Sequence, residues 1–426
     1  MKAKVLENML ALMIVQGSQY VLPLVTYPFL LRTVGTEGFG ILGLAHTLGF
    51  YFVVLTDYGF SLTATRAIAI HRHEPDRLSE LISGIWLMKG GLILLGFLLT
   101  LAFCALVPGY WDYRWVFVGS YLRVVGDALF PLWYFQGLER MKVITALNLL
   151  AKSWTVLAIL LWVKHPDDLV LAAVLNSSGS LLMGILGLGM ILRDPLWRWQ
   201  RVSLSFVCQH IRQGFPVFLA QLSHSLLTNT HVIILGLFAD LSTLGSFILA
   251  ERIVRALSLI VVPLGNAIYP QISQIFQASR ATGLRFLRQW IPPMVVGFIL
   301  LSLAMFTWAD TLVFWLGGSP NPDSSRYVQW MASMPLITLI YVMFGNGILM
   351  ALGYNHRYSR CFVMAGSLVF ILSLLTVPWL GANATAVLMP LGDGILTGFI
   401  LWTVWDIGIT PLLRDRYTQP VPKSSV

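Results

Sequence analysis

Residues 81–106 read LISGIWLMKGGLILLGFLLTLAFCAL, and the run contains a single ionisable side chain, that of Lys89. A helix of about 20 mostly apolar residues crosses the hydrocarbon core of a bilayer, so this run predicts a transmembrane helix. Similar runs recur and predict an all-α polytopic membrane protein with about twelve spans, at residues 8–31, 40–63, 81–106, 115–137, 143–163, 169–192, 214–238, 246–271, 291–316, 327–352, 361–380 and 385–408.

The composition indicates that lipid is the main solvent of the protein. Hydrophobic residues make up 57% of the chain and charged residues 11%, whereas roughly a quarter of the residues of a soluble domain are charged. The net charge of +9 lies mostly in short connections between the apolar runs, a distribution that the positive-inside bias of membrane proteins explains. We therefore expect no nucleic-acid partner.

Lys and Arg are distributed unevenly over the connections between the predicted spans. With twelve spans both termini lie on one side of the membrane, and the connections on that side hold most of these residues. The opposite connections hold only Arg32, Arg114, Lys164 and Arg326. This asymmetry predicts that both termini are cytoplasmic.

The longest internal connection, residues 193–213, lies at mid-chain and carries Trp197, Trp199 and Arg212. Tryptophan and cationic side chains are typical of a membrane interface. We therefore predict a cytoplasmic amphipathic linker between two six-helix bundles. The predicted segments are the first bundle at 1–192, the linker at 193–213, the second bundle at 214–408 and a cytoplasmic tail at 409–426.

The two predicted bundles are related in sequence. A shift that sets Gly40 on Gly245 also sets Leu44 on Leu249, at equivalent depths in the predicted spans. Six spans per bundle is an even number, so both copies keep one orientation. The pattern predicts a parallel repeat about an axis along the membrane normal, a plan used by alternating-access transporters.

Several ionisable side chains fall inside the predicted spans, where each costs roughly 2.5–3.5 kcal/mol near the helix centre. Arg123 and Asp127 are four residues apart on one helical face, and so are Glu251 and Arg255. Such pairs either neutralise one another structurally or line a cavity, and the sequence leaves both interpretations open.

Other charged residues have no such partner. Lys152 and Arg252 lack an obvious opposite charge four residues away, which favours a place in a cavity. Lys89 lies near enough to the end of its span to snorkel to the interface. Asp57 lies near a helix end, where a capping or packing role is at least as reasonable as ion coupling.

The first and seventh spans each carry a polar stripe at helical spacing. The stripe of the seventh span consists of Gln221, His224, Ser225, Thr228 and His231. The stripe of the first span consists of Gln16, Gln19, Tyr20, Pro23 and Tyr27. In lipid a polar face turns toward protein or water. Hydrogen bonding between packed helices is one interpretation, but the matching places of the stripes favour a shared aqueous cavity.

A cavity of this kind suits an anion that bears many hydroxyl groups. Unpaired Lys and Arg attract phosphate, Arg through a bidentate fork, and amide, hydroxyl and aromatic side chains bond or stack on sugars. The candidate cavity residues are Lys89, Arg123, Lys152, Arg252, Arg255, Gln16, Gln221 and His224. The candidate ion-coupling residues are Asp57, Asp127 and Asp393.

The sequence contains no GxxxxGK[ST], GxSxG or HExxH motif. We therefore expect no catalytic residue, no metal ligand, no cofactor and no use of ATP. The driving force is then an ion gradient, with H⁺ or Na⁺ as the candidate coupling ion, or the gradient of the substrate itself.

Five stretches carry a resemblance to a known family: residues 23–40 (PLVTYPFLLRTVGTEGFG), 56–66 (TDYGFSLTATR), 130–142 (FPLWYFQGLERMK), 245–252 (GSFILAER) and 263–270 (PLGNAIYP). They resemble the Wzx-type O-antigen flippases of the polysaccharide-transporter family. This family belongs to the multidrug/oligosaccharidyl-lipid/polysaccharide (MOP) exporter superfamily. The resemblance covers nearly the whole chain.

The resemblance implies a MOP-type fold, with two six-helix bundles around a central cavity, in the bacterial inner membrane. It also implies alternating-access transport of undecaprenyl-pyrophosphate-linked repeat units of O-antigen, or of a related surface polysaccharide, from the cytoplasmic to the periplasmic leaflet. This is a transport step of lipopolysaccharide biosynthesis. Expected partners are the lipid-linked oligosaccharide, membrane lipid, the O-antigen polymerase and the chain-length regulator.

Two alternative functions stay open. A cation-coupled multidrug antiporter of the same superfamily would share the fold, but a basic cavity fits a cationic drug poorly. A membrane polysaccharide polymerase would need substantial periplasmic loops, and the predicted external connections, such as residues 317–326, are short.

Overall fold

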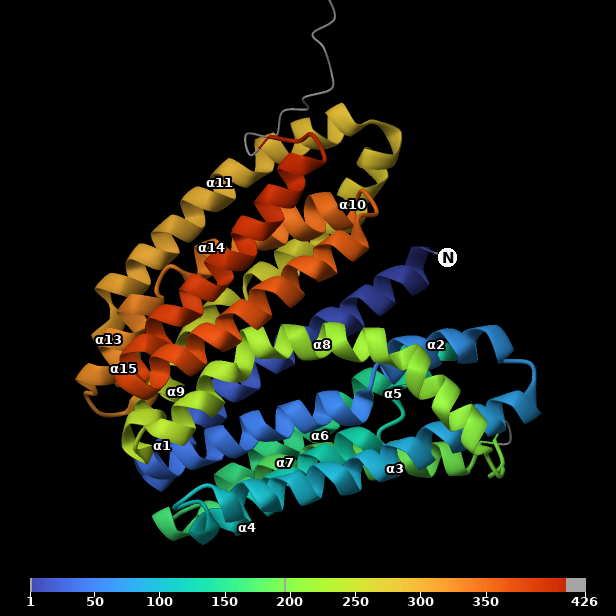
Figure 1. Ribbon diagram of the computed structural model, residues 1–426, viewed down its shortest axis with the longest axis horizontal. Helices are drawn as coiled ribbons and strands as arrows, with labels where there is room; N and C mark the ends of the chain where they lie inside the picture. The colour runs from blue at the N-terminus through green and yellow to red at the C-terminus, as the bar shows by residue number, and fades with distance from the viewer. Residues whose placement is uncertain (1, 195–196, 411–426) are drawn as a thin grey trace, which may run out of the picture. The chain divides into compact units, whose positions relative to one another are not determined.

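The chain is α-helical through almost all of the part that the structure describes (Figure 1). In this computed structural model the backbone is described for residues 2–194 and 197–410, and side chains within these ranges are described except those of 2–24, 204, 266 and 267. No strand occurs within the described ranges. The predicted all-α fold is confirmed.

The helices alternate with short connections along the chain. Up to residue 194 they are α1 (Lys2–Asp57), α2 (Phe60–His71), α3 (Pro75–Leu106), α4 (Arg114–Leu129), α5 (Leu132–Gly137), α6 (Met141–Trp162) and α7 (Leu169–Leu192), with 3₁₀ turns at Trp111–Tyr113 and Pro166–Asp168. From residue 204 they are α8 (Leu204–Phe238), α9 (Leu241–Ser258), α10 (Val261–Ala278), α11 (Arg280–Thr307), α12 (Ala309–Gly317), α13 (Pro322–Met331), α14 (Met334–Phe344) and α15 (Asn355–Asp406), with a π-helical turn at Gly345–Met350.

Helices α1 and α15 each consist of two segments joined at a glycine. The backbone has φ 74° and ψ 174° at Gly35, and φ 58° and ψ −140° at Gly381, conformations that favour glycine. A straight helix of the 56 residues of α1 would be about 84 Å long, whereas the bilayer core is about 30 Å thick. Both breaks fall in predicted connections, 32–39 and 381–384.

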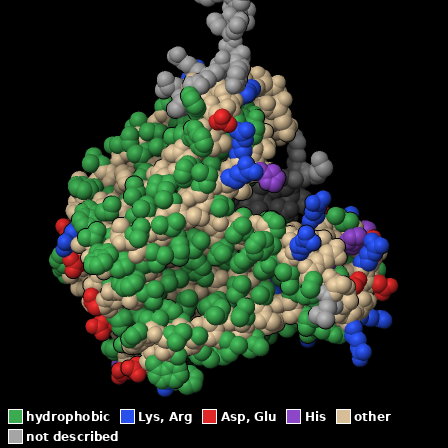
Figure 2. All heavy atoms as spheres, viewed as in Figure 1, with side chains coloured by type: hydrophobic (Ala, Val, Ile, Leu, Met, Phe, Trp, Pro, Cys, Tyr) green, Lys and Arg blue, Asp and Glu red, His purple; other side chains and the backbone are tan. Residues whose placement is uncertain are grey.

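Large apolar side chains cover the outer faces of several helices. Eight described helical segments are long and apolar enough to cross a membrane. Leu94 of α3 and Leu300 of α11 are 60% and 61% exposed, and Figure 2 shows hydrophobic side chains over much of the visible surface. Such continuous apolar area is unusual in a water-soluble monomer and fits contact with lipid.

The chain packs into two compact units. The first unit is formed by Met1–Ser225, Val232–Ile248 and Leu316–Gly318, and the second by Leu226–His231, Leu249–Trp315 and Ser319–Val426. The bounds of the predicted bundles, 1–192 and 214–408, stay a prediction, because the first unit also takes in much of α8. Residues 411–426 of the predicted tail lie outside the described residues.

In the first unit, α4 and α7 approach each other closely through glycines. A Cβ added to Gly126 would collide with the backbone of Ser180, and one added to Gly184 would collide with the carbonyl oxygen of Gly126. Small residues permit such approach between membrane helices. The approach sets the charged face of α4 beside the polar residues of α7.

In the second unit, the apolar core lies between α10, α11, α14, the π turn and both segments of α15. Leu339, Ile348, Leu396 and Ile400 are fully buried in it. Thr338 and Tyr341 lie on the same helix as Leu339 but line a small cavity instead. Packing of α14 on one face therefore fixes the direction in which its polar face points.

The connection between α7 and α8 differs from the predicted amphipathic linker. Helix α8 begins at Leu204 and continues through Pro216 to Phe238, so Arg212 belongs to the same helix as the predicted seventh span. Residues 197–203 are not helical. The backbone amides of Arg198 and Gln200 donate to the hydroxyls of Ser79 and Ser83, at 3.0 and 3.1 Å, which fixes this segment to α3.

Candidate functional site

The first unit contains a polar cavity of 370 Å³, named the N-terminal cavity below. Helices α1, α4, α6 and α7 contribute its walls. The lining residues are Thr26, Tyr27, His46, Arg123, Asp127, Asn148, Ala151, Lys152, Thr155, Val156, Asn176, Gly179, Ser180 and Met183. A volume of this size falls within the range of small-molecule sites.

Two cations and one carboxylate face the N-terminal cavity. The Nε atom of Arg123 lies 3.6 Å from Oδ2 of Asp127, which is close enough for an ion pair and too far for a hydrogen bond. Lys152, one helix away, forms no ion pair with any residue that the structure describes. Among the described residues that line the cavity, two cations therefore face one carboxylate, and the roles of Arg123 and Lys152 stay predictions.

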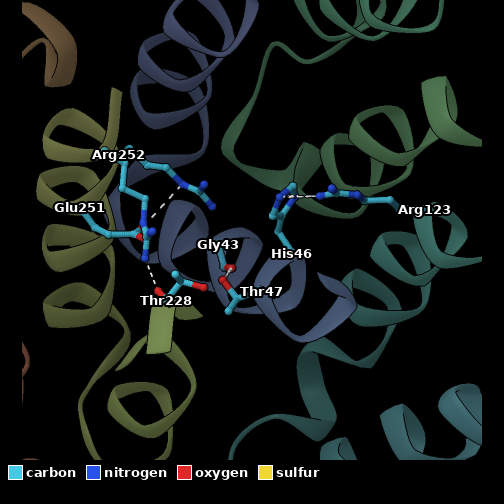
Figure 3. A network of polar contacts seen from close by, with 8 residues as sticks. Gly43, His46, Thr47, Arg123, Thr228, Glu251 and Arg252 are labelled. Atoms are coloured by element: carbon cyan, nitrogen blue, oxygen red, sulfur yellow. Dashed lines mark hydrogen bonds and ion pairs between the residues drawn. The ribbon is translucent and has the colours of Figure 1, made fainter. Parts of the chain in front are cut away.

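A histidine that the sequence reasoning missed completes this charged wall. Nη1 of Arg123 lies 3.0 Å from Nδ1 and 2.5 Å from Nε2 of His46, and Figure 3 shows the two side chains pointing toward each other. His46 lies within the predicted span 40–63 and is ionisable. A search for all titratable side chains inside spans, rather than for full charges and stripes, would have found it.

The second unit contains a smaller cavity of 90 Å³, named the C-terminal cavity below. Its walls are Leu227, Thr228, His231, Arg255, Ser258, Leu259, Val262, Met334, Thr338, Tyr341, Met389 and Asp393. Thr338 donates a 3.5 Å hydrogen bond to Asp393. The structure thus brings together Arg255 and Asp393, two predicted site residues from different helices.

Glu251 is the centre of a buried charge cluster in the second unit. It is 3% exposed and forms an ion pair with Arg255, which also donates to the carbonyl oxygen of Thr228. Nε of Arg252 lies 3.8 Å from Oε2 of Glu251 (Figure 3). The residues four positions from Arg252 suggested that it has no partner. The structure instead pairs it with Glu251, the adjacent residue in the chain.

Lys89, Asp57 and Gln221 are predicted site residues that line neither of the two cavities, and neither do Arg252 and His224. Lys89 is buried, and its ammonium donates to the carbonyl oxygen of Ala128 at 3.4 Å, so its charged end does not reach the surface of the protein. Asp57 ends α1 and accepts hydrogen bonds from Ser61 at 2.9 Å and Gln221 at 3.3 Å. Both donors are side chains, of α2 and α8, so these bonds connect Asp57 to neighbouring helices, and its role stays a prediction.

The two predicted stripes are placed only in part. In α8, Thr228 and His231 line the C-terminal cavity, whereas His224 is exposed and lines neither cavity. Of the first stripe, Tyr27 lines the N-terminal cavity. The side chain of Gln16 lies outside the described residues.

The helices and their charged cavities define a polytopic membrane protein, and comparison with known sequences assigns its family. Residues 5–276 match the family of polysaccharide biosynthesis proteins, and the chain belongs to this family. A protein of Escherichia coli (strain K12) with the name "Putative O-antigen transporter" is 30% identical over 390 residues, which cover 88% of this chain and 91% of the relative. A protein of the same name from Shigella dysenteriae is 23% identical over 400 residues, covering 93% and 99% of the two chains.

Solved structures of the MOP superfamily share the fold. A structure of the lipid II flippase MurJ in an inward closed conformation matches with a TM-score of 0.71 and 13% identity, over 94% of this chain and 87% of that one. An inward-facing multidrug resistance transporter of the MATE family matches with a TM-score of 0.66 and 14% identity, over 94% and 98% of the chains. At these identities the likeness concerns the fold alone.

These findings confirm three predictions. The chain is a member of the family that its motifs resemble, it has the MOP-type fold, and it is a multi-pass membrane transporter rather than an enzyme. The roles of the individual site residues stay predictions.

Proposed function

We propose that this protein is a flippase for undecaprenyl-pyrophosphate-linked repeat units of O-antigen or of a related surface polysaccharide. It carries them by alternating access from the cytoplasmic to the periplasmic leaflet of the bacterial inner membrane. The observation that carries the proposal is the N-terminal cavity, in which Arg123 and Lys152 face a space bordered by transmembrane helices.

The charges of this cavity suit a pyrophosphate. Arg123 offers a planar fork of donors that matches phosphate oxygens, and Lys152 offers a compact ammonium. Because Asp127 offsets only one of the two cations, an anion that enters the cavity gains a net attraction. That attraction is stronger than it would be in water, since the effective dielectric constant inside a protein is lower.

The uncharged lining suits a glycan. Asn148 and Asn176 offer amide donors and acceptors, and Thr155 and Ser180 offer hydroxyls. These groups can exchange hydrogen bonds with sugar hydroxyls without adding charge. A cationic drug would instead favour acidic walls, so the N-terminal cavity supports the flippase over the multidrug antiporter.

Ion coupling belongs to the same proposal. Asp127 lines the N-terminal cavity and Asp393 lines the C-terminal cavity, and exchange of H⁺ or Na⁺ at either carboxylate would alter the local charge. Asp57 is a weaker candidate, because its carboxylate already accepts two side-chain hydrogen bonds.

The proposed setting follows from the charge distribution and the family. With both termini in the cytoplasm, the Lys- and Arg-rich connections face the cytoplasmic leaflet, as the positive-inside bias requires. The O-antigen polymerase and the chain-length regulator would act on the product in the periplasm and are proposed partners.

Deletion in the native host tests the proposal. The expected result is loss of long-chain surface glycan, with lipid-linked repeat units trapped on the cytoplasmic leaflet and rescue by a plasmid copy. The plasmid variants Arg123→Ala and Lys152→Ala are expected not to rescue, whereas Arg285→Ala, which alters an exposed residue of α11, is expected to rescue fully. Intact glycan combined with increased drug sensitivity would favour the antiporter.

A further inference from the structure

The contact between His46 and Arg123 joins two different helices inside the N-terminal cavity. His46 belongs to the second segment of α1, and Arg123 belongs to α4. Both side chains are partly buried, and one guanidinium nitrogen lies within hydrogen-bond distance of both imidazole nitrogens. The contact therefore fixes a cationic group of α4 by means of a group on α1.

The chemistry of the two groups determines the protonation of the histidine. A guanidinium has donors and no acceptor, so the imidazole must supply the lone pair. A neutral imidazole has one such lone pair, whereas a protonated imidazole has none and is itself a cation. The contact with Arg123 thus requires neutral His46, and a proton on His46 would break it.

Arg123 has a competing partner on its own helix. Asp127 follows it by one turn, and pairing at this spacing is the local default for Arg and Asp on a helix. The Nε–Oδ2 distance of 3.6 Å nevertheless exceeds hydrogen-bond length, while the bond to His46 is formed. Other groups that border the same space are Lys152 of α6 and Tyr27 of α1.

We infer that His46 is a positioning residue, which keeps the Arg123 guanidinium from forming a hydrogen bond with Asp127 and directs it to the anion of the transported substrate. The inference rests on the proposed function, since it concerns the same cavity. Without the imidazole acceptor, Arg123 would close onto Asp127, and an anion would then have to displace a carboxylate before it could bind.

If His46 positions Arg123, anion binding depends on pH in the opposite direction from the one expected if His46 only adds a positive charge. If His46 acts only by adding charge, acidification creates a cation beside the anion site and strengthens binding. If His46 positions Arg123 as an acceptor, acidification removes the acceptor and weakens binding. An imidazole ordinarily titrates near pH 6.5, so the range from pH 8 to 5.5 separates the two.

The test measures binding of undecaprenyl pyrophosphate to the purified full-length protein in detergent micelles at pH 8 and pH 5.5. His46→Gln keeps an acceptor but cannot be protonated, and His46→Leu removes the acceptor at similar size. At pH 8 we expect binding within about threefold of wild type for His46→Gln and about tenfold weaker for His46→Leu, the loss of one charge-assisted hydrogen bond. On acidification we expect wild type to weaken more than His46→Gln.

His46→Gln also serves as the control for the probe. The phosphate groups of the probe titrate near pH 6 and weaken binding to every variant, so the difference between wild type and His46→Gln isolates the histidine. The thermal unfolding midpoint verifies that each variant is folded. If His46→Leu is unfolded, the comparison of wild type with His46→Gln decides alone.

The outcomes separate failure of this inference from failure of the proposed function. Wild-type binding that strengthens on acidification relative to His46→Gln would overturn the positioning role. If His46→Leu binds the probe as tightly as wild type while Arg123→Ala binds it poorly, the positioning role of His46 is overturned. The anion site at Arg123 is supported in that case. Unchanged binding in both Arg123→Ala and Lys152→Ala would instead remove the N-terminal cavity as the anion site.

Discussion

Gly40 of α1 and Gly245 of α9 meet backbone to backbone. A Cβ added to Gly40 would lie 2.9 Å from the nitrogen and 3.2 Å from the Cα of Gly245. The same two glycines are equivalent in the internal repeat of the sequence. Both glycines lie in the first unit, and the absence of side chains at the two positions lets the backbones of α1 and α9 approach this closely.

Gly245→Ala is expected to lower the apparent melting temperature of the purified protein. The added methyl group would collide with the carbonyl oxygen of Thr36, and overpacking of this kind costs about 1–3 kcal/mol. Gly398→Ala is the matched control, because nothing lies within 4 Å of a Cβ at that position. Equal shifts in the two variants would contradict the close approach of α1 and α9.

Glu251→Ala is expected to reduce the yield of folded protein, measured by size-exclusion chromatography of solubilised membranes. The change leaves Arg255 and Arg252 without the carboxylate that both approach, and loss of one partner of a buried pair costs about 3–5 kcal/mol. Asp406→Ala is the control, since its ion pair with Arg357 is exposed and worth about 0–1 kcal/mol. Similar yields for both variants would argue against a buried cluster.

Asp240 is expected to give the start of α9 a pH-dependent stability. The carboxylate accepts a 2.9 Å bond from the amide and a 2.7 Å bond from the hydroxyl of Thr243, and these bonds lower the pKa of Asp240 below its usual value. A depressed pKa stabilises the fold above the unfolded-state pKa, near 3.9, and this stabilisation is lost as pH falls through the folded-state value.

Thermal unfolding of wild type and Asp240→Asn at pH 7 and pH 3 checks this expectation. At pH 7 we expect Asp240→Asn to melt at a lower temperature, because a neutral amide accepts weaker bonds than a carboxylate and lacks its favourable interaction with the helix dipole. At pH 3 the wild-type carboxyl becomes increasingly protonated and the gap should narrow. A gap of constant size would show that the charge of Asp240 has no part in capping α9.

The ion-coupling candidates are expected to separate in a transport assay. Asp57→Asn should keep most of its activity, because an amide oxygen can still accept the bonds from Ser61 and Gln221. Asp393→Asn should lose the stimulation that an imposed H⁺ or Na⁺ gradient gives in proteoliposomes. The opposite pattern would transfer the coupling role from the C-terminal cavity to the end of α1.

The sequence predicts much of the fold because lipid imposes a simple rule on it. Long apolar runs are helical because a helix satisfies every backbone hydrogen bond within lipid. The breaks at Gly35 and Gly381 fall in the predicted connections between these runs. The polar residues around Arg212 led us to place a linker up to residue 213, whereas α8 runs without interruption from Leu204 to Phe238. Its continuity with the span depends on packing against α3, which periodicity does not report.

The sequence indicates which charged residues are candidates for the site, but it does not indicate which residues they contact. Arg123, Asp127 and Lys152 share one cavity, as residue type indicated. The link to His46 depends on how α1 and α4 pack, and the pairing of Arg252 with Glu251 depends on side-chain rotamers. Spacing along one helix contains neither kind of information.

Reconstitution of the purified protein into vesicles measures directly whether it moves a lipid-linked oligosaccharide across the bilayer by way of the N-terminal cavity. Purified protein and undecaprenyl-pyrophosphate-linked oligosaccharide are placed in vesicles, and the fraction of glycan open to an externally added glycosidase is followed over time. We expect wild type and Arg285→Ala to move the glycan between leaflets much faster than it moves in protein-free vesicles, and we expect no such increase with the double variant Arg123→Ala/Lys152→Ala. Wild-type movement no faster than in protein-free vesicles, or full activity of the double variant, would contradict this role of the cavity.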